Sequence, residues 1–327
     1  MRTRVTDLLG IRHPVLLGGM AGASGARLVA AVSQAGGLGL LAGSTLAPAA
    51  LEAEIAGIRE LTSLPFGVNL LLWSASYKVE TVLAQQPAVL STAWGNPSPY
   101  IEVAHEAGAL VVHMVHDVPG AIAASMAGVD LIVAQGHEGG GHVGLQSTFT
   151  LLPQVVDAVG DIPVVAAGGI ADGRGLAAAL ALGAEGVLMG TRFLATVEAP
   201  IPDGWKRSIL EAGGHQTVYS PVIDIANEAA WPSPAAARAI RNAFLDRWVG
   251  KEDEVRERSS QLGRELAAAK RSDDRDEMAM LAGEAVGLIN DLPTAAEVVE
   301  RIVREAEALL PQLAAKLAGK RVPNARS

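Results

Sequence analysis

Short apolar runs of four to six residues alternate with longer, alanine-rich amphipathic segments along residues 13–189. Such runs predict strands that are buried on both faces, and helices between them predict parallel pairing. Eight units of this kind are the number that closes a (β/α)8 TIM barrel, which we favour over an open doubly wound sheet. The predicted strands of this α/β fold are His13–Gly18, Leu38–Ala42, Phe66–Leu70, Ala88–Thr92, Ala109–Met114, Asp130–Ala134, Ile162–Ala167 and Gly186–Met189.

The segments between these runs predict the barrel helices, for example Ala26–Gln34, Pro48–Leu61, Val118–Ala127 and Gly173–Leu182. After the eighth strand, the alternation of apolar runs and amphipathic segments ends. Arg238–Trp248 predicts an amphipathic helix, and Lys251–Met280 is charge-dense and helix-prone. Residues 201–290 are therefore expected to form an inserted, mainly helical lid subdomain.

The last segment, Thr294–Leu317, returns to the barrel pattern. It begins with a capping box, in which Thr294 is followed three residues later by Glu297, and it carries an apolar stripe. We interpret it as the helix that completes the barrel. The expected barrel domain thus comprises residues 1–200 plus 291–327.

Composition excludes several functional classes. The chain has no cysteine, which removes disulfides, thiolate metal sites and cysteine nucleophiles. Its net charge of −9 argues against a nucleic-acid partner, which requires a basic surface. No apolar run is long enough to span a membrane, and the first residues lack the apolar region of a secretory signal. We expect a soluble, cytoplasmic protein.

The densest glycine cluster, Gln135–Gly144 (QGHEGGGHVG), directly follows the sixth predicted strand. A zinc site is disfavoured, because His137 and His142 are five residues apart across three glycines rather than four apart on a helix. At the carboxyl end of a barrel strand, a glycine-rich loop lets the backbone approach a ligand closely. A histidine here lies on the face where these folds place catalysis, so we favour a ligand site over a flexible turn with a solvent-exposed histidine.

Glycines also follow the seventh and eighth strands, as Gly168 and Gly169, and as Gly190 before Thr191. In barrels these two loops commonly bind phosphate through backbone N–H groups. The alternative is ordinary helix-start chemistry, with Asp172 as a cap. The presence of both loops at these two strands favours the phosphate site.

Further side chains stand at strand ends of the same face: Met20 after the first strand, Asn69 at the third and Gln135 at the sixth. Together they suit a planar heteroaromatic ring with hydrogen-bonding edges. His113 and Met114, at the end of the fifth strand, are weaker candidates. We interpret four further histidines as structural or surface residues, namely His13, His105, His116 and His215.

These motifs together resemble the FMN-dependent nitronate monooxygenase family, formerly called 2-nitropropane dioxygenases. The resemblance rests on the GGM, PFGVNL, QGHEGGGHVG, AAGGIADGRG and ALGAEGVLMGTRFL segments, and it resumes near residues 282–302. It implies that the flavin ring contacts Met20, Asn69 and Gln135, and that the ribityl chain and phosphate contact Gly140, Gly141, Gly168, Gly169, Gly190 and Thr191. His142 falls on the family's proposed base. Glu284 stands where the family often has glutamine, so its acid is expected to point toward the flavin or substrate.

The implied reaction is oxidation of an alkyl nitronate or nitroalkane with FMN and O2, giving a carbonyl compound and nitrite, with His142 removing the proton from a neutral nitroalkane. The main alternative is an FMN-dependent reductase that uses NAD(P)H to reduce a quinone or an enoyl thioester. A flavin-free phosphate-binding barrel and a non-catalytic flavin module are also left open. The sequence does not identify the physiological substrate, and it leaves open whether the charged insertion is exposed or forms a homodimer contact.

Overall fold

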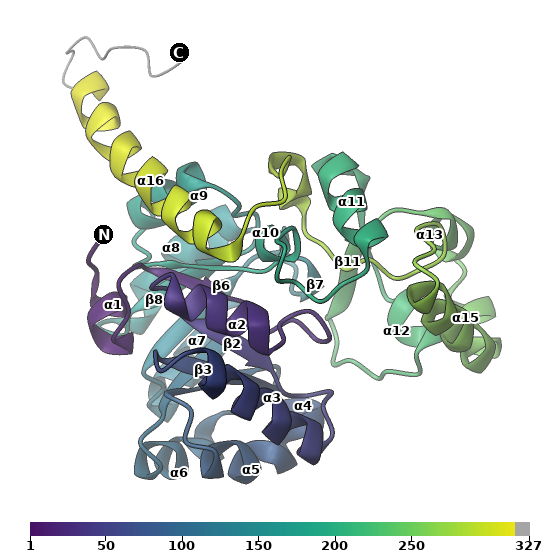
Figure 1. Ribbon diagram of the computed structural model, residues 1–327, viewed down its shortest axis with the longest axis horizontal. Helices are drawn as coiled ribbons and strands as arrows, with labels where there is room; N and C mark the ends of the chain where they lie inside the picture. The colour runs from purple at the N-terminus through teal and green to yellow at the C-terminus, as the bar shows by residue number, and fades with distance from the viewer. Residues whose placement is uncertain (318–327) are drawn as a thin grey trace.

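The computed structural model describes residues 1–317 and confirms the barrel (Figure 1). Its parallel strands follow the order β1-β9-β8-β6-β5-β4-β3-β2. A bridge between Leu16 in β1 and Leu38, directly before β2, joins the two ends of this order and closes the barrel. All eight predicted strands are present, within one to two residues of the predicted bounds in most cases. They are β1 (Val15–Leu17), β2 (Gly39–Ala42), β3 (Phe66–Leu71), β4 (Val89–Ala93), β5 (Leu110–Val115), β6 (Leu131–Gln135), β8 (Val164–Ala167) and β9 (Val187–Met189).

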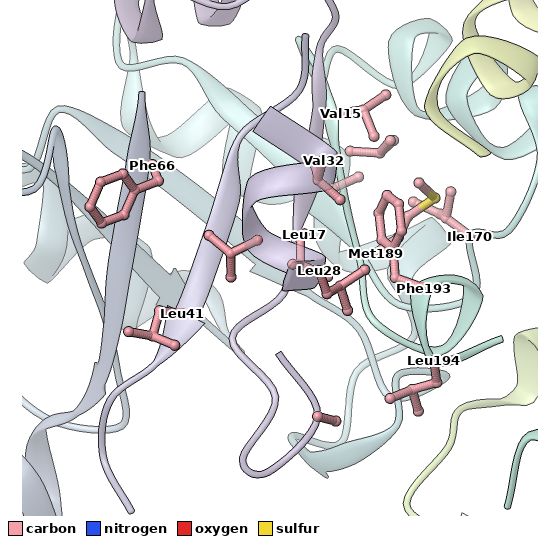
Figure 2. Close-up of a cluster of buried hydrophobic side chains, with 14 of the residues drawn as sticks. Val15, Leu17, Leu28, Val32, Leu41, Phe66, Ile170, Met189, Phe193 and Leu194 are labelled. Atoms are coloured by element: carbon pink, nitrogen blue, oxygen red, sulfur yellow. The ribbon is translucent and has the colours of Figure 1, made fainter. Parts of the chain in front are cut away.

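Side chains alternate between the barrel interior and the layer beneath the helices, as the period of a strand requires. Leu16 and Leu188 belong to the interior cluster, whereas Leu17 packs outward against helix residues Leu28 and Val32 (Figure 2). The interior cluster also includes Val5 and Leu9 of the N-terminal helix α1 (Arg4–Leu9). This helix therefore closes the amino-terminal end of the barrel, and the opposite end carries the loops.

The predicted barrel helices are observed with almost unchanged bounds, as α2 (Ala26–Gln34), α3 (Pro48–Leu61), α7 (Val118–Ala127) and α9 (Gly173–Ala181). The remaining helices of this part are α4 (Leu72–Ala75), α5 (Val79–Ala84), α6 (Ile101–Glu106), α8 (Thr148–Val159) and α10 (Thr191–Leu194).

The long C-terminal helix α16 (Ala295–Leu317) packs against α9 and α2 (Figure 1). The predicted capping box is formed: the Thr294 hydroxyl accepts from the Glu297 backbone N–H, and the Glu297 carboxylate accepts from the Thr294 backbone N–H. This reciprocal pairing satisfies two N–H groups that would otherwise lack partners at the helix start. Helix α16 thus occupies the gap in the helical ring between α9 and α2.

The residues between β9 and α16 are not as helical as predicted. They contain α11 (Asp203–Glu211), α12 (Val222–Ala226), α13 (Ala243–Trp248), α14 (Glu252–Glu257) and α15 (Ser259–Arg271), but also the strands β10 (Thr217–Ser220) and β11 (Ala236–Ile240). The expected helix Arg238–Trp248 is wrong in its first part, because residues 236–240 pair with strands on both sides. Asn242 then caps α13 by accepting from the Leu245 backbone N–H.

A short strand from the barrel completes the second sheet. Strand β7 (Gly141–Val143), which lies in the glycine-rich loop after β6, pairs antiparallel with β11, and the sheet order is β10-β11-β7 (Figure 1). The insertion has its own core, which includes Val222, Phe244 and Trp248. The end of the predicted glycine loop, Gly141–Val143, is therefore an ordered edge strand rather than a free turn. None of the helices within residues 1–317 combines the length and apolar character needed to cross a bilayer.

Gly39 in β2 marks a close approach between sheet and helix. A Cβ at this position would lie 2.2 Å from the carbonyl oxygen of Val29 in α2. We predict that Gly39→Ala lowers the free energy of unfolding by about 3 kcal/mol or more. The added methyl group would press on a backbone carbonyl oxygen, which cannot move aside without shifting helix α2. Urea unfolding followed by tryptophan fluorescence measures the change. Gly57→Ala in α3 is the matched control, since its Cβ meets Ala26 at an ordinary 3.4 Å; equal midpoints for both variants would contradict the prediction.

Candidate active site

A cavity of about 390 Å³ lies at the carboxyl ends of the strands, where the barrel meets the insertion. This volume is in the usual range for a small-molecule or cofactor site. The ten residues selected from the sequence all line it, although they come from loops far apart in the chain. They are Met20, Asn69, Gln135, Gly140, Gly141, His142, Gly168, Gly169, Gly190 and Thr191.

The two amides in the cavity are oriented by their neighbours. The Asn69 side-chain oxygen accepts from the Ser91 hydroxyl at 2.9 Å, and the Gln135 side-chain oxygen is 2.8 Å from Nε2 of His116. With both oxygens engaged by the protein, the NH2 groups are left as donors for a ligand. The cavity therefore offers hydrogen-bond donors at two points of an otherwise mainly apolar wall.

His116 is a structural residue, as expected, and its position lets it orient the side chain of Gln135. Burial lowers the pKa of its imidazole to about 4, so the ring is neutral near pH ~7 and can donate from Nε2 to Gln135. Trp94, at the end of β4, stacks on the ring with centroids 3.8 Å apart. These two contacts fix the orientation of the Gln135 amide.

The loops after β8 and β9 form a backbone cradle. Gly168 and Gly169 have φ angles of +97° and +74°, a left-handed conformation that favours glycine. Among the loop and turn hydrogen bonds of the described residues, none is donated by the backbone N–H groups of Gly168, Gly169 or Gly190. Unpaired N–H groups beside a helix start are what an anionic group requires.

The glycine-rich segment after β6 is held by contacts on both sides. The Glu138 carboxylate accepts from the backbone N–H and hydroxyl of Thr148, and Nδ1 of His137 lies 2.7 Å from the carbonyl oxygen of Gly144. Gly140 and Gly283 approach so closely that a Cβ on Gly140 would lie 2.5 Å from the Gly283 nitrogen. Side chains at this crossing would push the loop away from the cavity.

His142 lies on β7 and faces the insertion. Its Nε2 is 2.7 Å from an oxygen of Asp224 on α12, and the indole of Trp231 stacks on its ring with centroids 3.3 Å apart. Trp231 also contacts Trp73 and Trp94, so three of the chain's five tryptophans meet at this wall.

Sequence reasoning did not select Asp224 or Trp231. Asp224 is the one acid within an apolar VIDIA segment, and Trp231 begins a WPSP segment whose prolines are typical of a break in regular structure. An isolated acid in an apolar run is the signal that could have indicated a buried partner.

Of the three weaker candidates from the sequence, Glu284, His113 and Met114, one lines the cavity and two do not. The expectation for Glu284 is wrong: its carboxylate pairs with Arg238 at 3.1 Å and does not line the cavity, because the buried guanidinium attracts it. Met114 lines the cavity, whereas His113 does not and instead contacts the Thr92 hydroxyl at 2.8 Å.

A second, more open cavity of about 490 Å³ lies between α9 and α16. Its charged side chains are engaged with one another: Arg192 and Arg301 both pair with Asp291, and Arg174 pairs with Asp172. Because Glu305 in the same lining brings the three arginines and the acids into balance, we interpret this cavity as a structural ion-pair network rather than a reactive site.

Comparison with known proteins agrees with the fold. A family model described as Nitronate monooxygenase matches residues 2–77 and 73–305. A Mycobacterium tuberculosis protein named (3aS,4S,5R,7aS)-5-hydroxy-7a-methyl-1-oxo-octahydro-1H-indene-4-carboxyl-CoA dehydrogenase is 38% identical over 94% of this chain and 96% of its own length. A probable nitronate monooxygenase of Staphylococcus saprophyticus is 34% identical over 78% of this chain and 83% of its own length.

Two solved structures are similar over nearly the whole chain. FabK from Thermotoga maritima has a TM-score of 0.89 and 38% identity, and covers 97% of this chain and 99% of its own. Nitroalkane oxidase from Streptomyces ansochromogenes has a TM-score of 0.82 and 30% identity, and covers 94% of this chain and 99% of its own.

The depressed pKa of His116 predicts a pH-dependent stability. A folded-state pKa near 4 against 6.5 in the unfolded chain gives stability that is fully present above 6.5 and lost as the pH falls toward 4. We predict that His116→Gln reduces the loss between pH ~7.5 and ~5 by about 2 kcal/mol. Burial also lowers the pKa of His113 to about 4, so the contribution of His113 to the loss of stability at low pH remains in the variant. Urea unfolding at both pH values measures this, and an unchanged difference would contradict the assignment.

Proposed function

The chain belongs to the nitronate monooxygenase family, and from this premise we propose that it is an FMN-dependent enzyme that oxidises alkyl nitronates or nitroalkanes with O2. The observation that carries the proposal is the position of His142. A histidine fixed by a carboxylate faces a cavity that offers two amide donors and a backbone cradle. This arrangement suits proton removal from a carbon acid beside a flat cofactor.

The residues around the cavity fit FMN. The amide NH2 groups of Asn69 and Gln135 would donate to the acceptor edges of the isoalloxazine ring, and Met20 would contact its face. The unpaired backbone N–H groups after β8 and β9 would hold the phosphate. When bound, FMN supplies the electron acceptor and the reaction with O2.

The chain's own part in the reaction is proton transfer and positioning. His142 would accept the proton from the carbon next to the nitro group, and its imidazolium would then lie beside the nitronate anion. The tryptophans around Trp231 would exclude water from this region. We further propose that residues 201–290 act as a lid, which is supported by the cavity lining contributed by Asp224 and Trp231.

A second candidate is an FMN-dependent oxidoreductase of acyl or enoyl thioesters that uses NAD(P)H. The specific observation in its favour is that a relative named as a carboxyl-CoA dehydrogenase covers 94% of the chain, against 78% for the probable nitronate monooxygenases. The α-carbon of a thioester is also a carbon acid, so the same histidine would serve both reactions.

Anaerobic spectroscopy of the purified protein distinguishes the two candidates. We expect bound flavin to bleach on mixing with a secondary alkyl nitronate, and nitrite to form when air is admitted. In His142→Asn, turnover of a neutral nitroalkane should fall by roughly 10²-fold or more, whereas turnover of the preformed nitronate should fall much less. Bleaching by NADH or NADPH but not by the nitronate, followed by reduction of an enoyl thioester, would select the second candidate. Unchanged nitroalkane turnover in the variant would remove His142 from the mechanism.

The phosphate cradle is testable through flavin affinity. We expect Gly169→Ala to raise the Kd for FMN by about tenfold or more, because a side chain at φ +74° would distort the loop beside the phosphate. Titration of the apoprotein, followed by quenching of flavin fluorescence, measures the Kd. Gly160→Ala is the matched control, since Gly160 has φ +63° with nothing within 4 Å of an added Cβ and lies outside the cavity lining. Equal affinities would argue against the cradle.

A further inference from the structure

The buried carboxylate of Asp224 has an unusual set of neighbours. One oxygen lies 2.7 Å from Nε2 of His142, and within residues 1–317 the other oxygen is buried without a hydrogen-bond partner. A carboxylate that merely capped a helix or crosslinked the fold would accept from backbone N–H groups or pair with an arginine. Asp224 does neither, although it is only 7% exposed. Its interaction with the protein is therefore directed at one imidazole.

This contact determines which nitrogen of His142 is basic. A carboxylate accepts but cannot donate, so a neutral imidazole beside it carries its proton on Nε2. Nδ1 then holds the free lone pair. When Nδ1 takes up a proton, the resulting imidazolium is paired with a carboxylate that has no competing partner.

A second contact restrains the ring. The indole of Trp231 lies on its face, with centroids 3.3 Å apart and an interplanar angle of 11°. Rotation of the imidazole about its bond to Cβ would break the stack at intermediate angles, and a full flip would break the hydrogen bond. The ring is thus restrained at one edge and on one face, and within residues 1–317 Nδ1 is the ring nitrogen that has no hydrogen-bond partner, on a residue that lines the cavity.

From this geometry we propose that Asp224 is a positioning residue that makes Nδ1 of His142 the proton-accepting atom of the site. The inference rests on the proposed function only in the choice of a carbon acid as substrate. It also gives the insertion a chemical role, because the positioning carboxylate comes from α12, 82 residues beyond the histidine.

The test compares Asp224→Asn with the wild-type holoenzyme on a neutral nitroalkane and on its preformed nitronate. An asparagine can donate its NH2 to Nε2 and thereby place the proton on Nδ1, which blocks the base. We expect kcat for the nitroalkane to fall by roughly 10²-fold, and kcat for the nitronate to stay within about threefold, with KM little changed. Asp224→Glu, which keeps the acceptor, should recover part of the loss.

The matched control is Asp253→Asn, the same substitution on the exposed surface of α14 in the insertion. It should behave as wild type. A structural role for Asp224 would lower both activities together, or would leave Asp224→Glu no better than Asp224→Asn, and either result would overturn the proposal.

A spectroscopic measurement tests the tautomer without any substrate. The ¹⁵N shifts of the imidazole nitrogens, with His142 assigned by its loss in His142→Asn, should report a proton on Nε2 in wild type and on Nδ1 in Asp224→Asn. An unchanged tautomer would overturn the inference even if the enzyme oxidises nitronates. Conversely, the expected tautomer shift in a protein that oxidises neither nitroalkane nor nitronate would reject the proposed function and leave the role of Asp224 intact.

Discussion

The pairing of β7 with β11 is the contact on which the candidate site depends. Three residues of a barrel loop add as an edge strand to a sheet of the insertion, with His142 opposite Ala237. Backbone hydrogen bonds fix this register, so the side chain of His142 points to one defined side. Without the pairing, three successive glycines would leave the loop free to adopt many conformations, and the histidine would have no fixed position.

Around this junction, the site divides its tasks between two structural units. The barrel provides the amides and the glycine cradle, which line one side of the cavity. The insertion provides Asp224 and Trp231, which act on the histidine rather than on the ligand. In the proposed function, the portion that binds and the portion that sets the proton chemistry thus come from different parts of the chain, and β7 joins them.

Local sequence patterns predicted the barrel well because each strand and helix is encoded by its own residues. The apolar runs gave the eight strands, and the Thr294–Glu297 pattern located the start of α16. The ten candidate residues converge on one cavity because loops at the carboxyl ends of parallel strands share one face. The helix predicted across Arg238–Ile240 failed because those residues pair with strands distant in sequence, which no local periodicity reveals. The role of Asp224 was missed for the same reason, since it appears only when α12 is placed against β7.

The helix α1 at the other end of the barrel has a consequence for how ligands move. Val5 and Leu9 seal that end with apolar side chains, so the cavity communicates with solvent at the end that the insertion borders. A small molecule that reaches this cavity therefore enters from the side of the insertion and not along the barrel axis.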